Sequence, residues 1–89
     1  MVGTNAVTVQ VMPKSPDTDL EKLKKEIQEK LKKAKNMQIE EKEIAFGLKA
    51  LMLLIAWPEN EDTDEIENIL TEIEGVSSAR IEDIRRAFG

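Results

Sequence analysis

The segment Ala-Phe-Gly-Leu-Lys-Ala-Leu-Met-Leu-Leu-Ile-Ala-Trp-Pro-Glu occupies residues 45–59 of this 89-residue chain, and positions 50–57 carry no charge. A membrane-spanning helix needs about 20 apolar residues, so this run is too short to cross a bilayer. It lies between Gly47 and Pro58 and lacks the polar stripe of an amphipathic helix, which favours a buried central strand. Alternation predicts a core-facing set, Leu51, Leu53 and Ile55, and an opposite set, Ala50, Met52 and Leu54.

The flanking segments show alternating strand and helix patterns. Alternating valines predict a half-buried strand over 6–12, and a charged strand over 37–44 suits a sheet edge. Apolar residues spaced by three and four predict helices over 19–34 and 64–74. Thr18 followed by Glu21 resembles a capping box at the start of the first helix. For the second helix, Asp62 or Thr63 is expected to be the N-cap and Gly75 to lie at the C-terminal end.

A last strand is predicted over 76–84, with Ala79 and Ile81 facing inward, and residues 85–89 are expected to form a short tail. The order strand, helix, strand, strand, helix, strand predicts an α+β fold, a ferredoxin-like βαββαβ sandwich. In this fold two helices cover one face of a four-stranded antiparallel sheet, here as one domain over residues 1–89. The other face, around Met52 and Leu54, is either an ordinary exposed patch or a surface covered by a partner.

The composition excludes several classes of chemistry. The chain has no cysteine, histidine or tyrosine, so thiolate metal sites, cysteine nucleophiles and histidine bases are absent. We therefore expect no enzymatic reaction, no metal and no cofactor. The net charge of −5 makes the chain a poor general nucleic-acid binder. The N-terminus lacks the basic and apolar regions of a secretory signal, which predicts a soluble, cytoplasmic protein without membrane partners.

Charge is unevenly distributed along the chain. Seven lysines lie between Lys22 and Lys35, and eight acidic residues lie between Glu59 and Glu74. These runs are either solvated helix faces or patches that dock on an oppositely charged protein.

The common functions of this fold each require characteristic residues that a sequence either has or lacks. RNA-binding sheets carry aromatics on their open face, where the first strand here has Thr8 and Gln10. A metal carrier would need two cysteines, and an acylphosphatase-like enzyme would need a glycine-rich loop with an arginine after the first strand. The alternative is a non-catalytic scaffold or a small-ligand-sensing domain, for which the Met52–Leu54 face offers a surface for dimerisation.

Three ordered blocks resemble one known family. They are VMPKSPDTDLEKLK (11–24), IAFGLKALMLLIAWPENED (44–62) and TDEIENILTEIEGVSSARIEDIRR (63–86), and IAFGLKAL at 44–51 is the most specific piece. Together they are similar to the archaeal translation elongation factor 1-beta family. The resemblance implies a guanine-nucleotide exchange factor that promotes GDP release and GTP reloading on the GTPase elongation factor 1-alpha.

The resemblance also implies a partner-binding site. In the related G-F-G block an aromatic residue inserts into the GTPase, and by position that residue is Phe46, with Ala45 in place of the first glycine. We expect Phe46 to be exposed in the free protein. A family lysine near the C-terminus falls on Gly89, and the cations nearest to it are arginines. The implied partner-binding residues are Phe46, Gly47, Lys49, Arg85 and Arg86; the alternative for both arginines is that they solvate a fraying terminus.

Overall fold

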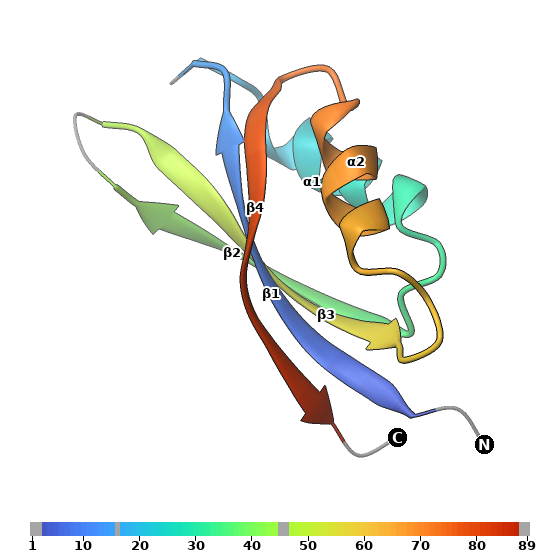
Figure 1. Cartoon of the computed structure of the whole chain (residues 1–89). Coiled ribbons are helices and arrows are strands. Elements are labelled where there is room, and N and C mark those ends of the chain that lie inside the picture. The colour runs from blue at the N-terminus through green and yellow to red at the C-terminus, as the bar shows by residue number, and fades with distance from the viewer. Residues whose placement is uncertain (1–2, 16, 45–46, 88–89) are drawn as a thin grey trace.

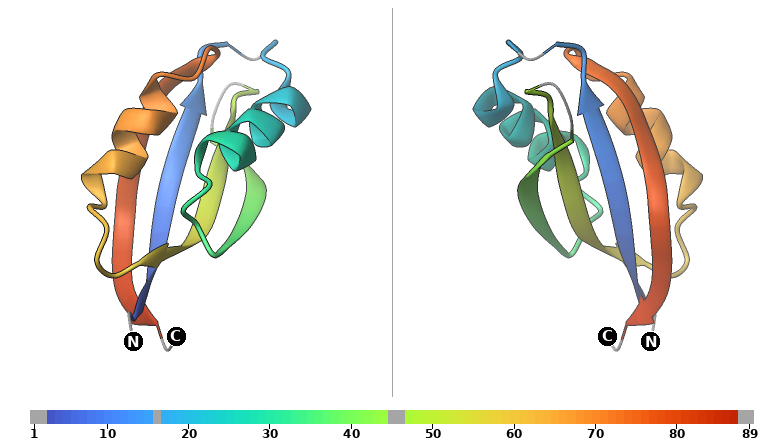
Figure 2. Two further views of the ribbon diagram at one scale, coloured as in Figure 1. Left: turned by 90° about the vertical axis from the view of Figure 1, so that its right-hand side faces the viewer. Right: turned by 90° about the vertical axis from the view of Figure 1, so that its left-hand side faces the viewer.

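The computed structural model describes residues 3–15, 17–44 and 47–87. In this part of the chain it has four strands and two helices: β1 (Thr4–Pro13), α1 (Leu20–Lys30), β2 (Asn36–Glu43), β3 (Lys49–Pro58), α2 (Asp64–Thr71) and β4 (Val76–Ala87). The strands form one antiparallel sheet in the order β2-β3-β1-β4, and both helices lie on the same face of it (Figures 1 and 2). The predicted α+β ferredoxin-like fold is confirmed.

Strand β3 is central, as predicted, and its alternation places one set of side chains in the core. Leu51, Leu53 and Ile55 are fully buried and pair with the three buried valines of β1. Each such burial stabilises the fold by about 1.5–3 kcal/mol. On the opposite phase Leu54 keeps 46% of its surface exposed, whereas Ala50 is fully buried. The burial of Ala50 differs from the expected exposed set because a single methyl group is easily covered by its neighbours.

Helix α1 begins one residue later and ends four residues earlier than the pattern predicted. Asp19 is the N-cap, and its Oδ1 accepts hydrogen bonds from the backbone N–H groups of Glu21 at 3.1 Å and Lys22 at 3.3 Å. The predicted cap, Thr18, is wrong by one residue. The helix ends at Lys30 instead of residue 34, since Leu31 leaves the helical conformation with φ −97° and ψ 57°. Leu31 is nonetheless buried, so apolar spacing continued past the helix end.

Helix α2 also differs at its ends. Thr63 occupies the N-cap position without a side-chain cap bond among the described residues, and Asp62 Oδ1 accepts from the Asp64 N–H at 2.9 Å instead. The helix ends at Thr71, three residues before the predicted end. Gly75 therefore lies beyond the C-cap Glu72, where its φ of +98° allows the turn into β4.

Strand β4 continues to Ala87 and so includes the first three residues of the segment that was expected to be a tail. Arg85 pairs with Ala6 and Arg86 with Asn5, because the first residues of β1 extend far enough to provide backbone partners. The pairing shifts register between Ile81 and Asp83, which is the signature of a bulge. Before the shift Ala79 and Ile81 pack against the core, as predicted.

Trp57, near the end of β3, is fully buried in the core cluster. It pairs with Asn5 of β1. Its indole N–H has no hydrogen-bond partner in the described part of the chain. The apolar packing of the large ring therefore outweighs the loss of solvation at one donor.

Candidate functional site

Near its end the β2–β3 hairpin separates from β1 and β4, which continue to pair with each other. Among the described residues, β1 pairs with β3 only as far as Val11 and Leu51. Beyond this point β3 pairs with β2 alone, through Ala50 with Lys42 and the pair that follows it. The backbone N–H of Ile44 donates to Leu48 O at 3.0 Å and continues the pairing. We call residues 42–44 and 47–50 the ribbon; Figure 1 shows it projecting away from β1 and the helices.

Gly47 lies at the end of the ribbon and has φ +77°, a left-handed conformation that favours glycine. A Cβ atom added there would meet nothing within 4 Å in the described structure, so backbone conformation and not space requires the glycine. Phe46 and Ala45 lie outside the described residues, and the exposure and wedge role of Phe46 stay predictions.

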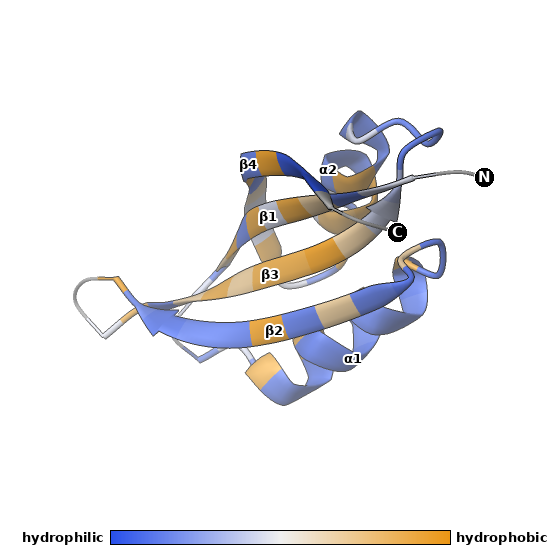
Figure 3. Ribbon diagram, turned by 90° about the horizontal axis from the view of Figure 1, so that it is seen from below, coloured by the Kyte–Doolittle hydropathy of each residue, from blue (hydrophilic) through white to orange (hydrophobic). Residues whose placement is uncertain are grey.

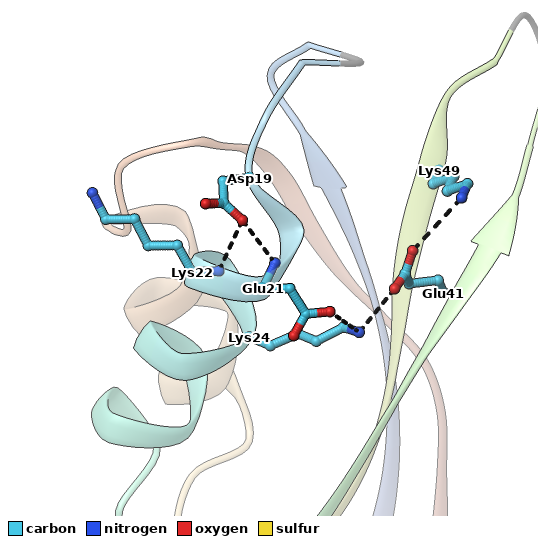
Figure 4. A network of polar contacts seen from close by, with 6 residues as sticks. All are labelled: Asp19, Glu21, Lys22, Lys24, Glu41 and Lys49. Carbon is cyan, nitrogen blue, oxygen red and sulfur yellow. Dashed lines mark hydrogen bonds and ion pairs between the residues drawn. The ribbon is translucent and has the colours of Figure 1, made fainter.

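Lys49 belongs to a chain of alternating charges at the base of the ribbon (Figure 4). Its Nζ lies 3.8 Å from Glu41 Oε1, and Glu41 Oε2 accepts a hydrogen bond from Lys24 Nζ at 2.9 Å. Lys24 also contacts Glu21 Oε1 at 3.5 Å. The hydrogen bond to Glu41 raises the pKa of Lys24, and the same bond lowers the pKa of Glu41. Both shifts favour the charged forms of Lys24 and Glu41.

The two C-terminal arginines of the predicted site lie elsewhere. Arg85 Nε donates to Asp83 Oδ2 at 2.7 Å, and Arg86 Nη2 donates to Glu59 Oε1 at 2.8 Å. Both arginine side chains are highly exposed, at 80% and 78%. As neighbours in a strand they point to opposite faces of the sheet.

The predicted site residues therefore form two groups at opposite ends of the sheet. Arg85 pairs with Ala6, which pairs with Ala56 of β3. Lys49 lies seven residues from Ala56 along the same strand. At about 3.3 Å per residue, the two groups are about 23 Å apart. The structure does not bring the four described residues, Gly47, Lys49, Arg85 and Arg86, into one local cluster.

The acidic segment is partly neutralised within the chain. Lys33 Nζ lies 2.9 Å from Glu65 Oε1 and 3.4 Å from Glu61 Oε2, and the bond to Glu65 raises the pKa of Lys33. Glu67 Oε2 accepts the backbone N–H of Ile81 at 3.0 Å, which ties α2 to the edge strand β4. Sequence reasoning missed these contacts because the partners are distant along the chain.

The face of the sheet opposite the helices holds a shallow depression of about 360 Å³, lined by Thr8, Gln38, Glu40, Lys42, Met52, Leu53 and Leu54. Figure 3 shows that β3 is mainly apolar and that β2 beside it is mainly hydrophilic. Within residues 3–15, 17–44 and 47–87, no group of three or more acidic side chains is placed to hold a metal ion. The described helices are also too short and too polar to span a membrane.

These features define a small ferredoxin-like α+β protein whose described candidate residues lie at two ends of one sheet. Residues 6–87 match the model of the EF-1 guanine nucleotide exchange domain. The chain belongs to this family, which confirms the resemblance found in the sequence.

Several relatives match along nearly the whole chain. Elongation factor 1-beta of Methanothermobacter thermautotrophicus is 45% identical over 87 residues, which cover 96% of this chain and 98% of that protein. The elongation factor 1-beta of Methanosphaerula palustris is 39% identical, with 93% and 96% covered. That of Caldivirga maquilingensis is 44% identical, with 85% and 87% covered. The chain has a guanine-nucleotide exchange role in translation elongation, and the scaffold or ligand-sensing alternative is not favoured.

Proposed function

We propose that the chain promotes GDP release from elongation factor 1-alpha, so that this GTPase can reload with GTP. The match of residues 6–87 to the exchange-domain family carries the proposal. The ribbon supports it, because Gly47 lies exposed at its end.

Such an activity requires no covalent step. A protein that binds the nucleotide-free GTPase more tightly than the GDP-bound form lowers GDP affinity by the same coupling free energy. The chain's own residues then need only to bind, to orient and to displace contacts around the nucleotide. A chain without histidine and cysteine can perform all three tasks.

The separation of the two residue groups sets the shape of the proposed contact. A standard interface covers about 800 Å² on each partner, which corresponds to roughly 30 Å across. One GTPase can therefore touch both the ribbon and the arginine end if it lies along the length of the sheet. Arg86 must then exchange its bond to Glu59 for a contact with the GTPase.

The deciding experiment follows the release of labelled GDP from purified elongation factor 1-alpha with and without the chain. The chain should accelerate release when it is present at far lower concentration than the GTPase. No acceleration by the folded chain would refute the proposed function.

Variants then separate the two ends of the sheet. Phe46→Ala and Gly47→Ala change the ribbon end, and Arg85→Ala with Arg86→Ala changes the other end. The matched control is Arg80→Ala, which removes the remaining arginine of the chain from the middle of β4. We expect Phe46→Ala to slow release strongly while the fold is retained. If all variants release GDP at the rate of the Arg80→Ala control, the assigned residues have no role.

A further inference from the structure

The backbone pairing between β2 and β3 is not enough to hold the ribbon in one orientation relative to the sheet. Two antiparallel strands alone are marginally stable in water, and the ribbon has only β2 and β3 to pair with in the described structure. Its outer residues Lys42, Glu43 and Ile44 are exposed. On the β3 side, Ala50 is buried and Leu48 is half-buried. Apolar packing therefore holds mainly the β3 strand of the ribbon and leaves the β2 strand to polar contacts.

A network of charges lies at the point where the ribbon begins. Glu41 pairs with Leu51, the last β3 residue that also pairs with β1. Its two carboxylate oxygens face Lys24 of α1 and Lys49 of β3, so one side chain connects a helix with both strands of the hairpin (Figure 4).

Lys24 is well placed to hold this network. Its side chain is only 22% exposed, compared with 78% for the neighbouring Glu21. Helix α1 is itself anchored in the core by Leu23 and Ile27. The ammonium group is therefore presented from a fixed element toward the base of the ribbon.

We propose that Lys24 is a positioning residue for nucleotide exchange, which acts through Glu41 and Lys49 to direct the ribbon toward the GTPase. This inference rests on the proposed function, since it concerns how the exchange surface is presented. When the network is lost, the ribbon samples several directions and only a fraction of molecules is ready to bind. Apparent affinity falls in proportion to that fraction, while the rate within the bound complex is unchanged.

Lys33 offers a matched control on the same stretch of chain. It contacts two carboxylates at 2.9 and 3.4 Å, compared with 2.9 and 3.5 Å for Lys24. Its partners are Glu61, in the loop before α2, and Glu65, in the first turn of α2, and neither belongs to the ribbon. Substitution of either lysine removes a similar pair of contacts, but only Lys24 is connected to the ribbon.

The test compares Lys24→Met, Lys24→Arg, Glu41→Gln and Lys33→Met in the GDP-release assay. Methionine keeps most of the lysine stem and removes its charge. We expect Lys24→Met and Glu41→Gln to raise KM about two- to fivefold with kcat unchanged. Lys24→Arg should restore the wild-type KM, and the double variant Lys24→Met with Glu41→Gln should be no worse than either single variant.

Amide hydrogen exchange gives a second readout that needs no GTPase. The Ile44 N–H, which bonds to Leu48 O within the ribbon, should lose protection in Lys24→Met and keep it in Lys33→Met. Equal KM values for Lys24→Met and Lys33→Met would overturn the inference, and so would unchanged protection of Ile44 in Lys24→Met. A wild-type chain without exchange activity would instead refute the proposed function, and the hydrogen-exchange comparison would still decide whether Lys24 holds the ribbon.

Discussion

Adjacent leucines of β3 test the assignment of the two sheet faces. Leu53 is fully buried, whereas Leu54 is 46% exposed, although both have the same side chain on the same strand. Leu53→Ala removes buried carbon atoms and leaves a cavity, which should lower the free energy of unfolding by about 2.7–5 kcal/mol. For Leu54, burial of about half a side chain corresponds to about 1 kcal/mol.

The difference is large compared with the stability of the whole molecule. At 0.05–0.15 kcal/mol per residue, a chain of this length has a free energy of unfolding of about 4–13 kcal/mol. Urea unfolding followed by circular dichroism should therefore place the Leu53→Ala midpoint far below that of Leu54→Ala. Equal midpoints, or a lower midpoint for Leu54→Ala, would refute the pairing register, because a slip by one residue exchanges the two faces.

Three further outcomes follow from local contacts. Gly75→Ala should lower the free energy of unfolding by about 1–2 kcal/mol, measured by urea unfolding, because φ is +98° while space for a Cβ exists. Glu67→Leu should lower it by about 1–3 kcal/mol, and Glu67→Gln by less, because glutamine can still accept the Ile81 N–H; equal losses would contradict this bond. Hydrogen bonding to Lys24 lowers the pKa of Glu41 below its ordinary 4.5. The charged carboxylate therefore contributes fully to the stability of the fold above pH 4.5, and this stabilisation is lost as the pH falls through the lowered pKa. The difference in urea midpoint between wild type and Glu41→Gln should accordingly shrink in acid.

The central strand and the layer order could be predicted because they depend on local periodicity. The uncharged run around Leu53 has the length of a strand, and the stripes of both helices face it. Helix ends were less predictable, because the apolar spacing continues beyond the point where the backbone leaves the helical conformation, as the buried Leu31 shows. Asp19 and Thr18 are both good capping residues, and only the geometry of the turn selects one of them.

The candidate site was harder to predict because its parts are connected through tertiary contacts. Lys24 and Glu41 are 17 residues apart, and no local pattern pairs them. Arg85 and Arg86 were expected in a tail, since core packing requires β4 only to about residue 84. The backbone of β1 nevertheless continues to pair with β4 at Arg85 and Arg86, which place no apolar side chain in the core. The role of Phe46 rests on the family resemblance and stays a prediction.

The burial of Trp57 gives this molecule a built-in optical probe. It is the single tryptophan of a chain without tyrosine, so near-ultraviolet excitation of the indole reports from one site in the core. A fully buried ring emits at shorter wavelength than a hydrated one, and unfolding should shift the emission toward the red. Trp57 pairs with Asn5, which in turn pairs with Arg86, so a GTPase that reaches the arginine end of the sheet should change this signal, whereas contact with the ribbon alone should leave it nearly constant. In the free chain the same fluorescence distinguishes folded from unfolded molecules without an attached dye.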